Sequence, residues 1–232
     1  MNTAETAWIT AFLDVPASRH AAATAFWCAV TGATASPSRG ATGEFATLVP
    51  PDGDPYLRTQ RLASGPAGIH LDLHAPDGDL VPTRSPGGLP FCLNDGETGT
   101  RPMPRIWAAG HASLVDQVCL DIPAGTYDEE CAFWADLTGW ELSQTGRPEF
   151  RVLARPDRIP LRVLLQRLED GDGPVRAHLD LATTNRPAET DRHRDLGARV
   201  EATRQRWTVL RDPGGALYCI TDRDPYTGAL VD

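Results

Sequence analysis

The sequence contains no lysine, and all 22 of its basic residues are arginine. Because 31 acidic residues outnumber them, the formal net charge is −9 and the isoelectric point is about 5.1. Binding to nucleic-acid phosphates relies on clustered positive charge. The charge balance therefore argues against a nucleic-acid-binding function, and we expect no nucleic-acid partner.

Long apolar runs are also absent. The apolar stretches are short and are interrupted by Asp, Thr, Arg or Pro, and residues 1–12 do not show the basic region followed by an apolar region of a secretory signal. The five cysteines form an odd set without CxxC spacing, which favours buried free thiols in a reducing compartment. We therefore expect a cytoplasmic protein without a membrane partner.

Motifs of several large enzyme classes are missing as well. The chain has no GxSxG, no Walker A motif, no Rossmann glycine pattern and no HExxH. Nucleotide-dependent and serine-hydrolase functions therefore have no support in the sequence. With 41% hydrophobic and 7% aromatic residues, the composition is that of a packed globular protein.

The most informative feature is an internal repeat. Five motifs occur twice in the same order, at offsets between 105 and 108 residues. They are residues 12–16 and 119–123 (FLDVP and CLDIP), 25–32 and 132–139 (AFW and TG in each), 44–45 and 149–150 (EF), 60–62 and 166–168 (QRL), and 70–73 and 178–181 (HLDL). The chain is therefore predicted to consist of two tandem copies, residues 1–94 (copy one) and 113–225 (copy two), with a linker at 95–112 and a tail at 226–232.

The second half of copy one is shorter than that of copy two. A PGG motif followed by an aromatic-Cys pair occurs at residues 86–92 and again at 213–219, at an offset of 127. Copy one therefore lacks about 19 residues that copy two has at 186–204. Because residues 189–196 favour a helix that Gly197 ends, copy one is predicted to have lost a helix.

Copy two is expected to contain two units of similar order. The first has strands at 117–122, 141–143, 150–154 and 161–167 and a helix at 127–138, with Thr126 and Glu129 as a capping box and Gly139 at its end. The second has a strand at 177–181, the helix within 186–204, and strands near 200, at 207–211 and at 216–221. Each unit is thus βαβββ, and the second unit of copy one is cut short.

These motifs resemble the glyoxalase-like branch of the vicinal oxygen chelate superfamily, which includes glyoxalases, bleomycin resistance proteins and extradiol dioxygenases, and which is frequent in actinobacteria. The resemblance covers nearly the whole chain, twice. It implies an α+β fold in which paired βαβββ modules form cupped mixed sheets, the first copy having a shortened second module. It does not choose a function, because the superfamily includes lyases, isomerases, epimerases, dioxygenases and proteins that only sequester antibiotics.

The resemblance also implies where a metal would be held. In copy two the four ligand positions fall at Gln117, Gln166, His178 and Cys219, and in copy one at Thr10, Gln60, His70 and Cys92. The family's enzymes usually have Glu at the second and fourth positions, where this chain has an amide and a thiol. Amides and thiols suit Mg, Mn or Fe(II) poorly. A divalent metal is therefore less favoured than none.

Each copy has a His-x-Asp pair on one strand face, His70 with Asp72 and His178 with Asp180. The carboxylate could orient a catalytic imidazole, or the two groups could satisfy each other as a structural pair. In copy one His74 extends the pattern to HxDxH, so His70, Asp72 and His74 could bind a ligand or a metal, or could be polar residues that bond to neighbours.

The tryptophans divide into two groups. Trp27 and Trp134 lie on apolar stripes of the predicted helices and are expected in the core. Trp140 and Trp207 lie on strands of the fuller copy and are predicted to line the cup, where aromatic walls suit flat hydrophobic ligands.

Three functions remain open from the sequence. The first is binding of a small organic molecule, for example an antibiotic or another natural product, in a cup lined by Trp140, Gln166, His178 and Trp207. The second is a lyase, isomerase or dioxygenase acting on a small carbonyl-containing substrate, with His178 and Asp180 as the catalytic pair. The third is an interaction surface on the shortened copy one. We expect a monomer or homodimer.

Overall fold

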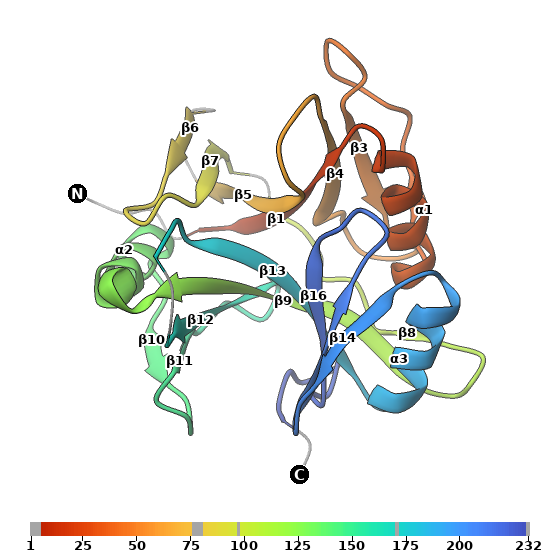
Figure 1. The fold of residues 1–232 in the computed structure, drawn as a ribbon. Coiled ribbons are helices and arrows are strands. Elements are labelled where there is room, and N and C mark those ends of the chain that lie inside the picture. Colours follow the sequence, from red (N-terminus) through yellow and green to blue (C-terminus); the bar gives the residue numbers. More distant parts are fainter. Residues whose placement is uncertain (1–5, 76–80, 97, 170–171, 231–232) are drawn as a thin grey trace.

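The computed structural model describes residues 6–75, 81–96, 98–169 and 172–230. Two strongly curved sheets lie back to back, and their concave faces point away from each other (Figure 1). The two sheets meet where β5 (Gly68–Ala75) of copy one contacts β13 (Arg176–Thr183) of copy two. The predicted α+β fold of two tandem copies with cupped mixed sheets is confirmed.

The first sheet is built by copy one and has the order β2-β3-β4-β1-β5-β7-β6. Its other strands are β1 (Trp8–Pro16), β2 (Thr34–Ala35), β3 (Phe45–Val49), β4 (Leu57–Leu62), β6 (Val81–Arg84) and β7 (Pro90–Asp95). β1 is parallel to β4 and antiparallel to β5, so this strand joins the two modules of the copy into one sheet.

The second sheet is built by copy two and repeats this arrangement, with the order β10-β11-β12-β9-β13-β16-β15-β14. Its strands are β9 (Ala112–Pro123), β10 (Leu142–Gln144), β11 (Phe150–Leu153), β12 (Arg162–Leu168), β13, β14 (Arg199–Thr203), β15 (Trp207–Arg211) and β16 (Leu217–Thr221). β8 (Arg105–Ile106), inside the predicted linker, pairs with the start of β9. No helix among the described residues is long and apolar enough to cross a membrane.

The helices are α1 (His20–Thr31), α2 (Tyr127–Thr138) and α3 (Arg186–Asp195), with a short 3-10 turn η1 (Ala124–Thr126) before α2. Gly32 and Gly139 end α1 and α2 in the left-handed conformation, at φ of 72° and 71°, as predicted for Gly139. The predicted capping box is wrong: Thr126 makes no capping bond to α2, because its hydroxyl donates back to the carbonyl of Pro123 instead.

Each first-module helix packs against the second module of the other copy. Trp27 of α1 lies against Tyr218 of β16 with ring centroids 5.2 Å apart, and Trp134 of α2 lies against Phe91 of β7 at 5.3 Å. Both indoles are almost completely buried, as predicted. The buried apolar residues of both copies therefore form one continuous core.

The two indole N–H groups have carboxylate acceptors from different places. Trp27 donates to Asp212 in the turn after β15, at 2.7 Å. Trp134 donates at 2.7 Å to Glu130 on its own helix, and the other Glu130 oxygen accepts the backbone N–H of Gly87 in the turn after β6. Each buried Trp therefore has a carboxylate beside it, but that carboxylate lies in a turn of the other copy for Trp27 and on the same helix for Trp134.

The second module of copy one contains no helix among its described residues, and β6 has no strand like β14 beside it. In copy two, α3 lies next to α1 of copy one, on the right in Figure 1, whereas α2 on the left has no helix beside it within the part of the chain that the structure describes. Residues 76–80, between β5 and β6, lie outside the described residues.

Candidate functional site

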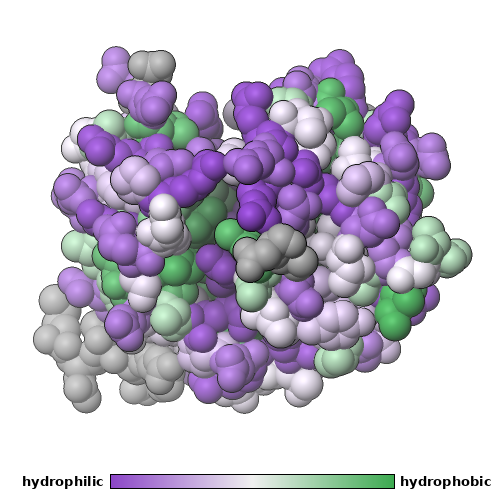
Figure 2. Space-filling view, turned by 90° about the horizontal axis from the view of Figure 1, so that it is seen from below, coloured by the Kyte–Doolittle hydropathy of each residue, from purple (hydrophilic) through white to green (hydrophobic). Residues whose placement is uncertain are grey.

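The concave face of the second sheet encloses a cavity of about 540 Å³. Its walls come from both modules of copy two, because β9 and β12 supply one half and β13, β15 and β16 the other. Figure 2 views the face onto which this cup opens and shows a hollow with hydrophobic residues inside mostly hydrophilic surroundings. The lining residues include Gln117, Cys119, Phe150, Arg162, Gln166, His178, Asp180, Trp207, Cys219 and Arg223.

Strand register aligns four polar side chains across the floor of the cup. Arg162 lies opposite Gln117, Gln117 opposite Asp180, and Asp180 opposite Cys219, so that one row crosses β12, β9, β13 and β16. Gln117 donates its amide N–H to Asp180. Since side chains alternate along a strand, the next inward pair is Cys119 opposite His178.

His178 lies between two carboxylates. Its Nδ1 is 3.1 Å from Asp121, and its Nε2 is 3.3 Å from Asp180 and 3.6 Å from the sulfur of Cys219. The predicted pairing with Asp180 is present, but Asp121, which the sequence analysis did not assign to the site, holds the other ring nitrogen. Because Gln117, Cys119 and Asp121 alternate along β9, their shared face was the sequence signal for this group.

The charges around His178 change its protonation. Burial disfavours the imidazolium, but negative charge on Cys119 when ionised and on Asp121 and Asp180 outweighs burial and raises the pKa of His178 well above its ordinary value. Burial itself raises the pKa of Cys119 to about 12, so this sulfur is a neutral thiol at neutral pH. The hydrogen bond and the charge of His178 in turn hold the pKa of Asp180 low despite burial.

Two aromatic residues from opposite walls meet across this cup. Phe150 of β11 and Trp207 of β15 have ring centroids 6.3 Å apart at an interplanar angle of 86°, and the guanidinium of Arg147 lies 5.6 Å from the Trp207 ring. Trp207 lines the cavity as predicted, whereas the prediction for Trp140 is wrong. Trp140 is 4% exposed and belongs to the hydrophobic core, because it follows directly after α2 and packs under the sheet.

Copy one places the equivalent residues differently. His70 bonds through Nδ1 to Asp14 at 2.8 Å, which repeats the pair of His178 with Asp121, but Phe12 takes the place of Cys119 and stacks on the His70 ring at 4.4 Å. His74 lies 3.4 Å from the hydroxyl of Thr10. His70, Asp72 and His74 share a face as predicted, yet the described part of copy one contains no cluster of three donors close enough to hold a metal ion.

Copy two does contain such clusters. One joins His178 with Asp180 and Cys219, and the other joins His178 with Cys119 and Asp121, with ligand atoms within 4.8 Å of one another. Of the predicted ligand positions, His178 and Cys219 come together, and Gln117 reaches this group through Asp180. Gln166 contacts the second cluster through its amide oxygen, which is 3.5 Å from the sulfur of Cys119.

The donor chemistry of these clusters fits zinc better than Mn or Fe(II). Thiolate, imidazole and carboxylate are all zinc ligands, and a second carboxylate on the distal nitrogen of a ligating His is a usual support. Among the described residues, the buried Oε1 of Gln117 lacks a hydrogen-bond partner on this floor, and Oδ1 of Asp180 has only its ion pair with Nε2 of His178, at 3.3 Å. A bound cation would satisfy both of them.

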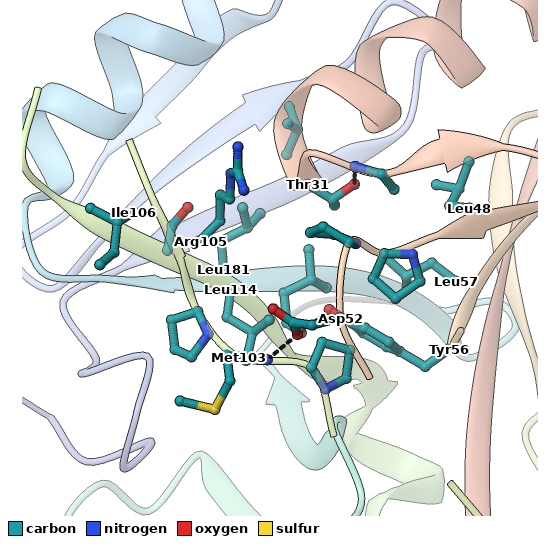
Figure 3. Close-up of a pocket in the computed structure, with 18 residues that line it drawn as sticks. Thr31, Leu48, Asp52, Tyr56, Leu57, Met103, Arg105, Ile106, Leu114 and Leu181 are labelled. Atoms are coloured by element: carbon teal, nitrogen blue, oxygen red, sulfur yellow. Dashed lines mark hydrogen bonds between the residues drawn. The ribbon is translucent and has the colours of Figure 1, made fainter. Parts of the chain in front are cut away.

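A second cavity, of about 260 Å³, lies between the end of α1, strands β3 and β4, and the linker (Figure 3). Its walls are mainly apolar. Two of its polar side chains already form hydrogen bonds within the protein: Asp52 accepts the backbone N–H of Met103 at 2.8 Å, and Tyr56 donates to the carbonyl of Val115 at 2.9 Å. We therefore place no functional site there.

Comparisons with known proteins agree with this geometry. The model of the family described as "Glyoxalase-like domain" matches residues 10–84 and 117–221. No curated protein matches the chain.

Solved structures share the fold at low sequence identity. The Mn(II)-bound glyoxalase from Novosphingobium aromaticivorans is 15% identical, with a TM-score of 0.65 over 94% of this chain and 82% of that one. The 2,2',3-trihydroxybiphenyl 1,2-dioxygenase from Sphingomonas wittichii strain RW1 is 12% identical, with a TM-score of 0.60 over 95% and 90%. A variant of homoprotocatechuate 2,3-dioxygenase from B. fuscum is 15% identical, with a TM-score of 0.63 over 97% and 74%.

Proposed function

Because the chain belongs to the glyoxalase-like domain family of the vicinal oxygen chelate superfamily, we propose that it binds a small organic molecule in the cup of copy two. The observation that carries this proposal is the cavity of about 540 Å³ above His178. Pockets for small molecules typically measure about 300–1,000 Å³ and combine apolar walls with a few convergent polar groups.

The comparison between the two cups supports copy two as the binding site. In copy one the ring of Phe12 stacks on His70, whereas copy two has the smaller Cys119 at this position and His178 lines the cavity. The Phe150 and Trp207 rings form an apolar wall suited to a flat molecule. Flat natural products, antibiotics among them, belong to this class.

A screen of flat aromatic fragments by ligand-observed NMR would test this proposal. The fragments that bind to the wild-type protein should bind more weakly to His178→Asn, because this substitution alters the floor of the cavity. His70→Asn makes the same change in copy one and should leave the binding unchanged. Equal loss in the two variants, or a protein that binds no fragment, would contradict the assignment to copy two.

A second candidate function is a metal-dependent enzyme of the lyase, isomerase or dioxygenase type. The cluster of His178, Asp180 and Cys219 favours it, because these residues would hold one zinc ion while Asp121 orients the imidazole. A bound zinc would supply Lewis-acid polarisation of a substrate carbonyl. The protonated His178 of the metal-free site would instead donate a hydrogen bond or a proton to a substrate oxygen.

Metal binding is measured independently of activity. Protein incubated with Zn²⁺ and desalted should retain about one equivalent, and Co²⁺ in its place should give a thiolate-to-metal absorption band. Both should be lost in Cys219→Ser and kept in Cys92→Ser, which makes the matched change in copy one. Retention of the band in Cys219→Ser would exclude this cluster as the metal site.

A further inference from the structure

The cavity of copy two has an excess of positive charge, although the whole chain has a net charge of −9. Four arginines line the cavity, Arg147, Arg162, Arg206 and Arg223, whereas Asp180 is the one carboxylate among the described residues that line it. Asp180 is already engaged by His178 and by the amide of Gln117. The lining therefore lacks the negative charge that would balance its guanidinium groups.

Two of these arginines have carboxylate partners of their own. Arg223 is 5% exposed and forms an ion pair with the fully buried Asp116. Arg147, at the mouth of the cup, pairs with Glu149 at 3.3 Å. The local charge of both is therefore largely balanced without a ligand.

Arg162 is different. Its one hydrogen bond within the described protein runs from Nη1 to the carbonyl of Gly228 at 3.3 Å, and its buried Nε has no partner. No ion pair joins it to a carboxylate of the described chain. Burial and the nearby charge of Arg223 lower the pKa of Arg162 to about 10, so the guanidinium is still charged at neutral pH. The charges of Asp116 and Asp180 offset part of this lowering, but both carboxylates are paired with other residues. A half-buried cation without a paired carboxylate is costly in a medium of low dielectric constant.

The position of Arg162 defines the orientation of a bound molecule. Arg162 begins β12, and Gln166, four residues further along this strand, lies opposite Phe150. Four residues of strand span about 13 Å. The cationic end and the aromatic wall of the cup are therefore separated by roughly the length of a small extended aromatic acid, allowing for the reach of the Arg162 side chain.

We infer that the molecule bound in the cup is an aromatic carboxylate, whose carboxylate pairs with Arg162 and whose ring lies against Phe150 and Trp207. This inference rests on the proposed binding function of copy two and names its ligand class. The planar guanidinium donates two parallel hydrogen bonds to a carboxylate, which fixes the ring toward the aromatic wall.

Pairs of probes that differ in charge and not in shape test this inference. Isothermal titration calorimetry would compare cinnamate with cinnamamide, and 2-naphthoate with 2-naphthamide, on the wild-type protein at low ionic strength. A charge-assisted hydrogen bond corresponds to a roughly 10- to 100-fold difference in affinity, so each carboxylate should bind that much more tightly than its amide. The difference should shrink as NaCl is added, because salt screens the charge of the partly open cup.

Variants of the chain locate the cation. Arg162→Gln should remove most of the advantage of the carboxylate, and Arg162→Lys should keep part of it, since a point charge replaces the two-pronged donor. Arg158→Gln is the matched control, because Arg158 is exposed in the loop before β12 and does not line the cavity. If Arg162→Gln does not fold, the carboxylate and amide pairs on wild-type protein still decide the question.

The outcomes separate the two proposals. Equal binding of carboxylate and amide would overturn the inference and leave the proposed binding function intact. Preference for the carboxylate that persists unchanged in Arg162→Gln would overturn the assignment to Arg162. Binding of neither probe of a pair, for both pairs, would count against the proposed function and the inference together.

Discussion

Replacement of Glu189 by Gln should destabilise the protein more than any change on the outer face of α3. Glu189 is fully buried and accepts hydrogen bonds from His111 at 2.7 Å, from Arg192 at 2.7 and 2.8 Å, and from His193 at 3.1 Å. Arg192 continues to the carbonyls of Ala29 and Val30 at the end of α1. One carboxylate therefore connects the linker, α3 and the helix of copy one.

The magnitude follows from the charge that the substitution leaves behind. Removing one partner of a buried ion pair costs about 3–5 kcal/mol. Arg192 is 18% exposed and Gln keeps one acceptor oxygen, so we expect a loss at or below the lower end of this range, about 2–3 kcal/mol in the free energy of unfolding. The guanidinium also lies 3.6 Å from the ring centroid of Trp107, and this contact should loosen together with the ion pair.

Urea unfolding, followed by far-UV circular dichroism, measures this loss. Asp191→Asn is the control on the same helix, because the Asp191 side chain is 71% exposed and its ion pair with Arg194 lies at the surface. The control should change the unfolding midpoint very little. A Glu189→Gln midpoint that equals that of Asp191→Asn would refute the role of Glu189 as the connection between the copies.

Three other predictions concern acid stability, the indole contacts and the thiols. Although burial opposes ionisation, hydrogen bonds from Arg192 and from a neighbouring His hold the pKa of Glu189 below its ordinary value. This group therefore adds stability above its unfolded pKa of about 4.3 that is lost as the pH falls, and urea midpoints of wild type should decrease more between about pH 5 and 3 than those of Glu189→Gln. Asp212→Ala leaves the Trp27 N–H without its acceptor and should cost about 1–3 kcal/mol in urea unfolding, a loss that should not add to that of Trp27→Phe. Because burial raises the pKa of Cys119, iodoacetamide at pH 8 should label this thiol slowly in folded protein and quickly in urea, as read by mass spectrometry; fast labelling of the folded protein would contradict its burial.

The repeat in the sequence predicted the two copies and their modules, and the family resemblance added the cupped sheets. Motifs such as LD(V/I)P and HLDL recur because each copy must build the same pair of central strands, so their order predicted βαβββ modules and the shortened second module of copy one. What the repeat did not indicate is how the helix of each copy also packs on the other copy. α1 contacts β1, β2 and β4 of its own copy, yet its Trp27 also lies against Tyr218 of β16 in the other copy, and no local pattern specifies this second contact.

The carboxylates beside the two buried indoles show the same limit. At an offset of 107 residues, Glu130 corresponds to Ala23, and Ser85 stands where copy two has Asp212. The sequence comparison shows two unrelated differences. In the structure both serve the same purpose, because Asp212 accepts the indole N–H of Trp27 from the other copy and Glu130 accepts that of Trp134 from the same helix.

At the site, the sequence by itself determined which strand faces carry polar groups, because side chains alternate with a period of two residues. His178 and Asp180 were placed on one strand face in this way, Gln166 and Cys219 were assigned from the family resemblance, and all four line the cavity. Tertiary structure decided which of these groups meet. Pairing of β9 with β13 and β12 brings Asp121 to His178 and Arg162 into the cup, and the end of α2 carries Trp140 into the core rather than to the cavity. The physical reason is that alternation fixes only the face on which a side chain lies, whereas strand register, sheet curvature and the packing of one copy on the other fix its partners.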